Sequence, residues 1–190
     1  MVEANVQVRG GLMRDQLAAL RKRPDADTIL ARIQPAYIEA IDRAMRVAWI
    51  DGEANYHVCE VVGDVLGLER GGRFYRESFR AAYDTPLFRT VVTGAMRIAG
   101  SDPGALYKML PKGTSLVFRG FGTFGTRDRE PNAITLEITD APARAFEHGA
   151  VWMHCAAQAN HAVLDILGLD GSVDVEIHPA ARRATFRYRW

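Results

Sequence analysis

The stretch Val173–Trp190, VDVEIHPAARRATFRYRW, decides the fold of this protein. Two runs within it alternate apolar and polar residues, which is the pattern of strands that bury one face. If the turn between the runs places His178 opposite Arg183, Val175 faces Phe186 and the apolar faces of both strands coincide. A slip by one residue would turn the arginines toward the core. We therefore predict an antiparallel hairpin in this register.

Three more strands and one long helix precede the hairpin. Apolar–polar alternation or β-prone composition predicts strands at Thr114–Arg119, Thr123–Arg127 and Ala133–Thr139. A helix is expected over about Pro142–Leu167, because Gly168 provides a stop signal. About five strands and one long helix predict an antiparallel sheet whose buried face is covered by that helix.

The first 111 residues predict helices only. Apolar residues recur there at steps of three and four, and the segments are bounded by glycine stops and by Thr-Pro or Asp-Pro starts. The expected helices are Leu12–Arg23, Thr28–Ile50, Ala54–Leu66, Arg73–Tyr83, Pro86–Ala99 and a short helix from Pro103 that ends before Pro111. The fold class is therefore α+β, in one domain over residues 1–190. A helical subdomain covers about 1–111 and an α/β subdomain about 112–190.

Charge and hydropathy exclude several classes of protein. Lys and Arg number 24 and Asp and Glu 23, a balance that argues against a nucleic-acid binder. The most apolar long stretch, Gly149–Leu169, is interrupted by His154, His161 and Asp165 and fails as a membrane span. The first sixteen residues lack the apolar core of a signal peptide. We expect a cytoplasmic protein that has no membrane span and binds no nucleic acid.

Gly120–Gly125 has the spacing G-x-G-x-x-G, which occurs in phosphate-binding loops. Such a loop must open a helix whose N-terminus meets the phosphate, whereas the residues that follow here end at Pro131 and form no helical pattern. The alternative is a tight turn in a hairpin, where glycine permits backbone angles that other residues avoid. We favour the turn.

Two polar stripes and two cysteines are the remaining candidates for chemistry. His154, Gln158 and His161 share one helix face, but no carboxylate completes a metal site, so we interpret the face as a polar stripe that is solvated or faces the other subdomain. A similar stripe, interpreted as solvated, comprises Glu53, His57 and Glu60. Cys59 and Cys155 form no zinc motif and are expected to be reduced and buried. Since no serine lies in a nucleophile motif either, we predict no enzyme and no catalytic or metal site.

Aromatic residues gather near the junction of the two halves. The candidate ligand contacts are Tyr75, Phe79, Phe118, Phe124 and Trp152. A helical layer against a sheet-and-helix layer leaves a crevice where ligand sites are common. The alternative is that these side chains fill the core, and the sequence leaves both open.

The predicted helix Thr28–Ile50 carries apolar residues too widely spread to face one core stripe. They are Tyr37, Ile38, Ile41, Val47, Trp49 and Ile50. Either the segment Leu12–Leu20 or a second copy of the chain must cover them. Because two-fold pairs are the commonest assembly, we predict a homodimer with this helix in or near the interface.

Four segments carry a likeness to known proteins. They are the run Phe74–Phe79 leading to Thr85-Pro86, the segment Asp102–Pro111, the helix entry Phe146–Gly149 and the closing Phe186–Trp190. From about Gly71 to Trp190 the chain resembles a family of uncharacterised paralogous proteins best known from myxobacteria. These segments are patterns of size and polarity, not catalytic signatures.

That family is similar in layout to the haem–nitric-oxide-binding, 4-vinyl-reductase-type and vesicle-tethering small-subunit folds. The resemblance implies a binding or signalling module. It carries over no cofactor residues: the Y-x-S-x-R motif of the haem proteins is absent, since Tyr75 is followed by Glu77 and Phe79, and two cysteines do not reproduce a metal site. We expect no cofactor, with haem kept as an alternative.

Three functions are therefore open. The first is a sensory or regulatory module that binds a small apolar or aromatic ligand between the helical and sheet halves. The second is a protein-interaction or dimerisation module with a filled core, and a signalling protein is the expected partner class. The third is a haem-dependent sensor.

Overall fold

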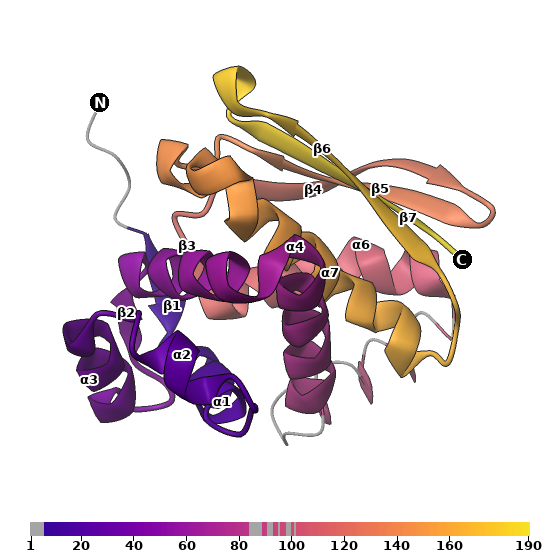
Figure 1. Ribbon diagram of the computed structural model, residues 1–190. Helices are drawn as coiled ribbons and strands as arrows, with labels where there is room; N and C mark the ends of the chain where they lie inside the picture. Colours follow the sequence, from indigo (N-terminus) through magenta and orange to yellow (C-terminus); the bar gives the residue numbers. More distant parts are fainter. Residues whose placement is uncertain (1–5, 84–88, 91–92, 95, 98–99, 101) are drawn as a thin grey trace.

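The computed structural model describes residues 6–190 apart from 84–88, 91–92, 95, 98–99 and 101 (Figure 1). The helix predicted over Pro86–Ala99 therefore lies largely outside the described residues. The fold is α+β, as predicted from the sequence: helices come first, and an antiparallel sheet with helices beneath it follows.

The main sheet has four antiparallel strands in the order β4-β5-β7-β6. Their bounds are Thr123–Glu130 for β4, Ala133–Thr139 for β5, Ser172–His178 for β6 and Arg183–Arg189 for β7. The hairpin β6–β7 has the predicted register, with His178 opposite Arg183 and Val175 opposite Phe186. Phe186 and Tyr188 are fully buried, while Arg187 and Arg189 face solvent. The alternation in the sequence thus reports the two faces of a central strand.

Three helices support the sheet and position the site. They are α4 (Glu53–Tyr83), α6 (Pro103–Val117) and α7 (Val151–Ile166). In Figure 1, α6 and α7 lie beneath the sheet, and α4 crosses α7. Helix α6 packs against β4 and β5, and α7 packs against α4 and β6. The sheet is therefore covered by two helices rather than by α7 alone.

Several predicted boundaries are wrong. The predicted stop at Gly67 is correct, because φ of 77° and ψ of 163° there divide α4 into two helices, but the second helix begins directly after Gly67 and not at Arg73. The helix expected from Pro142 begins at Val151, because two 3₁₀ turns, Ala143–Phe146 and His148–Ala150, precede it. Prolines and glycines mark these breaks only approximately.

The strand predicted at Thr114–Arg119 is mostly helix. Helix α6 continues through Pro111 to Val117, and only Phe118–Arg119 forms a strand, β3. The turn of helix after Pro111 keeps Thr114 and Val117 on the same face as Leu110. The helix was expected to end before Pro111 because proline lacks the backbone N–H that a helix interior uses.

The single helix predicted over Thr28–Ile50 is also wrong. The chain instead forms α2 (Ala26–Leu30), α3 (Pro35–Arg43) and strand β2 (Trp49–Asp51). Pro35 starts a new helix, as proline does at a first helical position. Strand β2 forms because it pairs with β1 (Gln7–Arg9), a partner 40 residues away that local periodicity cannot reveal.

A second, small sheet holds the N-terminal part together. Its order is β2-β1-β3, and helix α1 (Gly10–Leu20) leaves directly from β1. The guanidinium groups of Arg9 and Arg119 stack on the ring of Trp49, at 3.9 and 4.0 Å from its centroid. Buried side chains from this region and from the main sheet belong to one continuous core.

Candidate functional site

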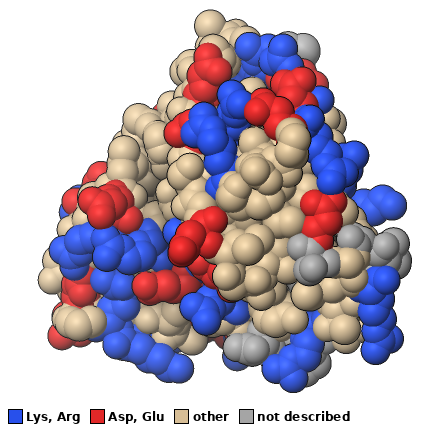
Figure 2. All heavy atoms as spheres, turned by 90° about the vertical axis from the view of Figure 1, so that its right-hand side faces the viewer, with Lys and Arg blue, Asp and Glu red and all other residues tan. Residues whose placement is uncertain are grey.

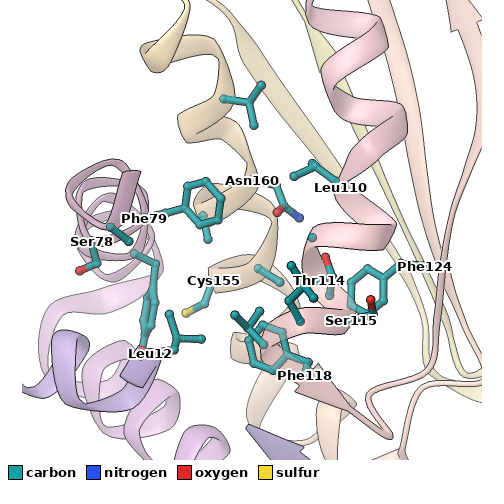
Figure 3. Close-up of a pocket in the computed structure, with 18 of the residues that line it drawn as sticks. Leu12, Ser78, Phe79, Leu110, Thr114, Ser115, Phe118, Phe124, Cys155 and Asn160 are labelled. Carbon is teal, nitrogen blue, oxygen red and sulfur yellow. The ribbon is translucent and has the colours of Figure 1, made fainter. Parts of the chain in front are cut away.

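A cavity of about 450 Å³ lies between α1, α4, α6 and α7 (Figure 3). That volume is within the range of pockets that hold small molecules. Most of its wall is apolar. Examples from each element are Leu12 of α1, Ala82 of α4, Leu110 of α6 and Val163 of α7.

The five aromatic residues singled out from the sequence all lie on this wall. Tyr75 and Phe79 belong to α4, Phe118 is in β3, Phe124 is in β4 and Trp152 is in α7. Tyr75 and Trp152 are buried, and the other three are half-buried. Figure 3 shows Phe79 on the α4 side and Phe118 and Phe124 on the α6 side. The structure thus brings the five together around an open volume.

Trp152 is held in one orientation by a buried hydrogen bond. Its indole Nε1 donates to Asn55 Oδ1 at 2.7 Å, and the Asn55 amide nitrogen lies 3.2 Å from the sulfur of Met13. The Trp152 ring also stacks on Phe121, with centroids 4.9 Å apart. A buried aromatic ring with a satisfied N–H has little freedom to move, so this part of the wall is rigid.

Two polar atoms in the wall, the side-chain oxygen of Gln16 and the hydroxyl of Tyr75, are buried without a hydrogen-bond partner. Gln16 of α1 lines the cavity and is 8% exposed, and its side-chain oxygen is buried without a hydrogen bond. A buried amide without a partner costs free energy. It provides a place where a ligand group that hydrogen-bonds would be favoured.

Sequence reasoning missed the contribution of α6 to the wall. Six of its nine lining residues follow the spacing of one helix face: Leu106, Met109, Leu110, Gly113, Thr114 and Val117. The other three are Lys112, Ser115 and Leu116. The steps of three and one are a helical signal. It was overlooked because the helix was expected to end before Pro111. From α7, the face that includes Ala156, Ala159 and Asn160 was missed as well.

The stripe Glu53, His57 and Glu60 is an ion-pair site rather than a solvated face. Arg144 donates to Glu53 at 3.1 Å and also to Glu60, and these bonds hold the pKa of Arg144 above its usual value. The ring of His57 accepts from the backbone N–H of Gln34 at 3.2 Å. The stripe therefore ties α4 to the segment before α7.

The other candidate motifs are structural. His161 is 1% exposed and its ring lies against Tyr188, which explains its place on α7 without a metal. No group of three or more histidines, cysteines or acids that could hold a metal occurs in the part of the chain the structure describes. Gly120 and Gly122 have positive φ in the turn before β4, and a strand follows where a phosphate loop needs a helix.

Surface charge shows no field of one sign on the face drawn in Figure 2. Lys and Arg are interspersed with Asp and Glu around an uncharged band. Among the described residues, no helix is both long and apolar enough to cross a membrane.

The fold is similar to that of H-NOX proteins. A mutant of the H-NOX protein from K. algicida in the unliganded Fe(II) state aligns with a TM-score of 0.66 and 10% identity, over 95% of each chain. A mutant of the H-NOX protein from T. tengcongensis gives 0.60 and 13%, over 95% of this chain and 96% of that one. An oxygen-binding H-NOX domain related to soluble guanylate cyclases gives 0.58 and 14%, over 95% and 94%.

At these identities the likeness concerns the fold alone. No family model and no curated protein matches the sequence. The predicted similarity in layout to haem–nitric-oxide-binding proteins is confirmed, whereas the likeness to a myxobacterial family stays a prediction.

Proposed function

We propose that the protein is a sensory or regulatory module that binds a small apolar or aromatic ligand in the cavity between α4, α6 and α7. One observation carries this proposal: a cavity of about 450 Å³ persists although five large aromatic side chains surround it. A packed core normally leaves no volume of this size. This supports the ligand-binding function over an interaction module with a filled core.

The wall also indicates what the ligand is like. Of its two charged residues, Asp15 already pairs with Arg46 at 2.5 Å, and Lys112 is exposed. A charged ligand would lose its hydration and gain no buried partner. An uncharged ligand with an aromatic or aliphatic body gains from each apolar contact and can place one polar group at Gln16.

Fluorescence titration with the neutral dye N-phenyl-1-naphthylamine tests this proposal. We expect saturable binding of one dye per chain. The variant Ala159→Phe fills the cavity and is expected to weaken binding at least tenfold. Ala180→Phe places the same ring on an exposed turn and serves as its control. Equal binding by both variants, or no saturable binding by the wild type, would refute the proposal.

A haem-dependent sensor is the second candidate, because the fold is similar to that of haem proteins. The wall does not fit a histidine-ligated haem. All five histidines lie among the described residues, and none of them lines the cavity. The other donors in the wall are the thioether of Met109, two thiols and a phenol. The thiols and the phenol ligate iron only after losing a proton. Burial raises the pKa of Cys155 and of Tyr75, which keeps both protonated.

Absorption spectroscopy separates these two candidates. Protein purified from cells supplied with a haem precursor is expected to show no Soret band, and added haemin is expected to bind no better to the wild type than to Ala159→Phe. A stoichiometric Soret band that disappears in Tyr75→Phe or Cys155→Ala would establish the haem function instead.

A further inference from the structure

The two cysteines of the chain meet at the cavity although 95 residues separate them in the sequence. Cys59 lies on α4 and Cys155 on α7, and both line the wall. They are 2% and 4% exposed, and neither forms a disulfide. In Figure 3 the sulfur of Cys155 points toward the side of the cavity where Leu12 lies.

The close packing of α4 on α7 holds the thiols near each other. A Cβ on Gly63 would lie 2.7 Å from a methyl carbon of Val151, and one on Gly72 would lie 2.7 Å from Cγ of Gln158. Only small residues at these positions allow the helices to approach so closely. Burial and the adjacent thiol of Cys59 raise the pKa of Cys155, so the Cys155 thiol rests in the protonated, uncharged form.

The chemistry of the pair restricts what it can bind. Zinc needs about four ligands, and no third histidine, cysteine or acid of the described chain joins the pair. A bare Cu⁺ ion with two thiolates would leave a net negative charge in an apolar wall, which is costly. By contrast, a trivalent arsenic atom that already carries one carbon substituent forms an uncharged product with two thiols.

We propose that Cys59 and Cys155 together form a binding site for organoarsenic(III) compounds that carry a small aromatic substituent. The inference rests on the proposed ligand-binding function and names a class of ligand for it. With an arsine oxide, two As–S bonds form and the As–O bond is broken. The two thiol protons leave with the oxygen as one water molecule, and arsenic stays trivalent. The aromatic substituent would occupy the apolar volume.

Intact-mass spectrometry with phenylarsine oxide tests the site. The folded protein is expected to gain one phenylarsenic group and to lose both free thiols. Cys59→Ala and Cys155→Ala are each expected to bind about a hundredfold more weakly, because the second sulfur supplies the effective concentration. The same loss is expected in urea, where the two cysteines are no longer held together. A dithiol, but not a monothiol, should reverse the adduct.

Three results would overturn the inference: no adduct on the folded protein, one adduct on each cysteine, or equal binding by the single-cysteine variants. Binding of N-phenyl-1-naphthylamine, measured on the same samples, keeps the two proposals apart. If the dye binds and the arsenical does not, only the dithiol site fails. If neither binds, the proposed function fails with it.

Discussion

Gly122 lies in the turn before β4, with φ of 101°. A Cβ there would lie 2.6 Å from the carbonyl oxygen of Thr139 and 2.9 Å from Cα of Ala141, so backbone would have to move. We expect Gly122→Val to lower the free energy of unfolding by about 1–3 kcal/mol or more, measured by urea denaturation. Neither the wild type nor the variant is expected to bind ATP or NAD.

Gly125→Val is the matched control for this prediction. Gly125 lies within β4, and nothing approaches the position of its Cβ within 4 Å. A β-branched residue is favoured in a strand, so this variant should be as stable as the wild type. Saturable nucleotide binding that is lost in Gly122→Val would instead identify a phosphate loop.

His161 makes stability depend on pH. Burial and the nearby guanidinium of Arg76 lower the pKa of this imidazole. The unfolded chain therefore binds the proton more readily, with a pKa near 6.5. The stabilising effect is complete above about pH 6.5 and declines as the pH falls below it. Asp165, whose pKa is lowered by Arg76, acts in the same direction only in stronger acid, below about pH 4.

Urea denaturation between pH 7 and pH 5 checks this prediction. The wild type should lose stability over this range, and His161→Gln should lose less. Some slope will remain, because burial lowers the pKa of His154 too. If the free energy of unfolding of His161→Gln depended on pH as steeply as that of the wild type, His161 would not be the source of the pH dependence.

At the scale of residues, the sequence identified the aromatic wall but not its thiols. Large aromatic residues near a junction of two layers are informative, because such side chains gather wherever layers meet. Cys59 and Cys155 lie at the same cavity because of the angle at which α4 crosses α7, and no local sequence pattern predicts a helix crossing angle. The same reason explains why Gln16 was missed.

Among the elements, α4 offers the clearest test. At Gly67 its φ and ψ, 77° and 163°, fall in a region that essentially only glycine adopts. We expect Gly67→Ala to destabilise the protein by about 1–3 kcal/mol. Gly113→Ala, inside α6 with open space around the Cβ, should be neutral or stabilise it by up to about 1 kcal/mol. Thermal unfolding of both variants gives the comparison, and equal effects would contradict it.

Elements were predictable where one face is buried along the whole segment. Strand β5 has the predicted bounds, Ala133–Thr139, because it alternates strictly and pairs on both sides. The prediction of one helix over Thr28–Ile50 was wrong because apolar residues recur at helical steps even across the breaks between α2, α3 and β2. The residues of β2 form a strand because they pair with β1, so tertiary pairing overrides the local helical periodicity in this segment.

On the scale of the whole molecule, the predicted homodimer loses its original basis, since Thr28–Ile50 is not one helix. The turn after α3 offers another: Met45 and Val47 are 71% and 75% exposed. We retain the homodimer as a prediction with this turn in the interface. Light scattering at micromolar concentration should give the dimer mass for the wild type and the monomer mass for the double variant Met45→Glu, Val47→Glu.

A monomer mass for the wild type would contradict the homodimer. A dimer that persists in the double variant would place the interface elsewhere. Leu68→Glu and Leu169→Glu are suitable controls, because both residues are exposed and apolar yet lie elsewhere, in α4 and in the loop before β6.

Strand β1 has a consequence for how the chain is made. It is the middle strand of the small sheet, and Val8 pairs with Ile50 on one side and with Phe118 on the other. During synthesis the first partner follows soon, but the second emerges only after 110 more residues. One edge of β1 therefore stays unpaired, and open to pairing with other chains, while these 110 residues are synthesised. The nascent protein is most in need of a chaperone before residue 118 leaves the ribosome.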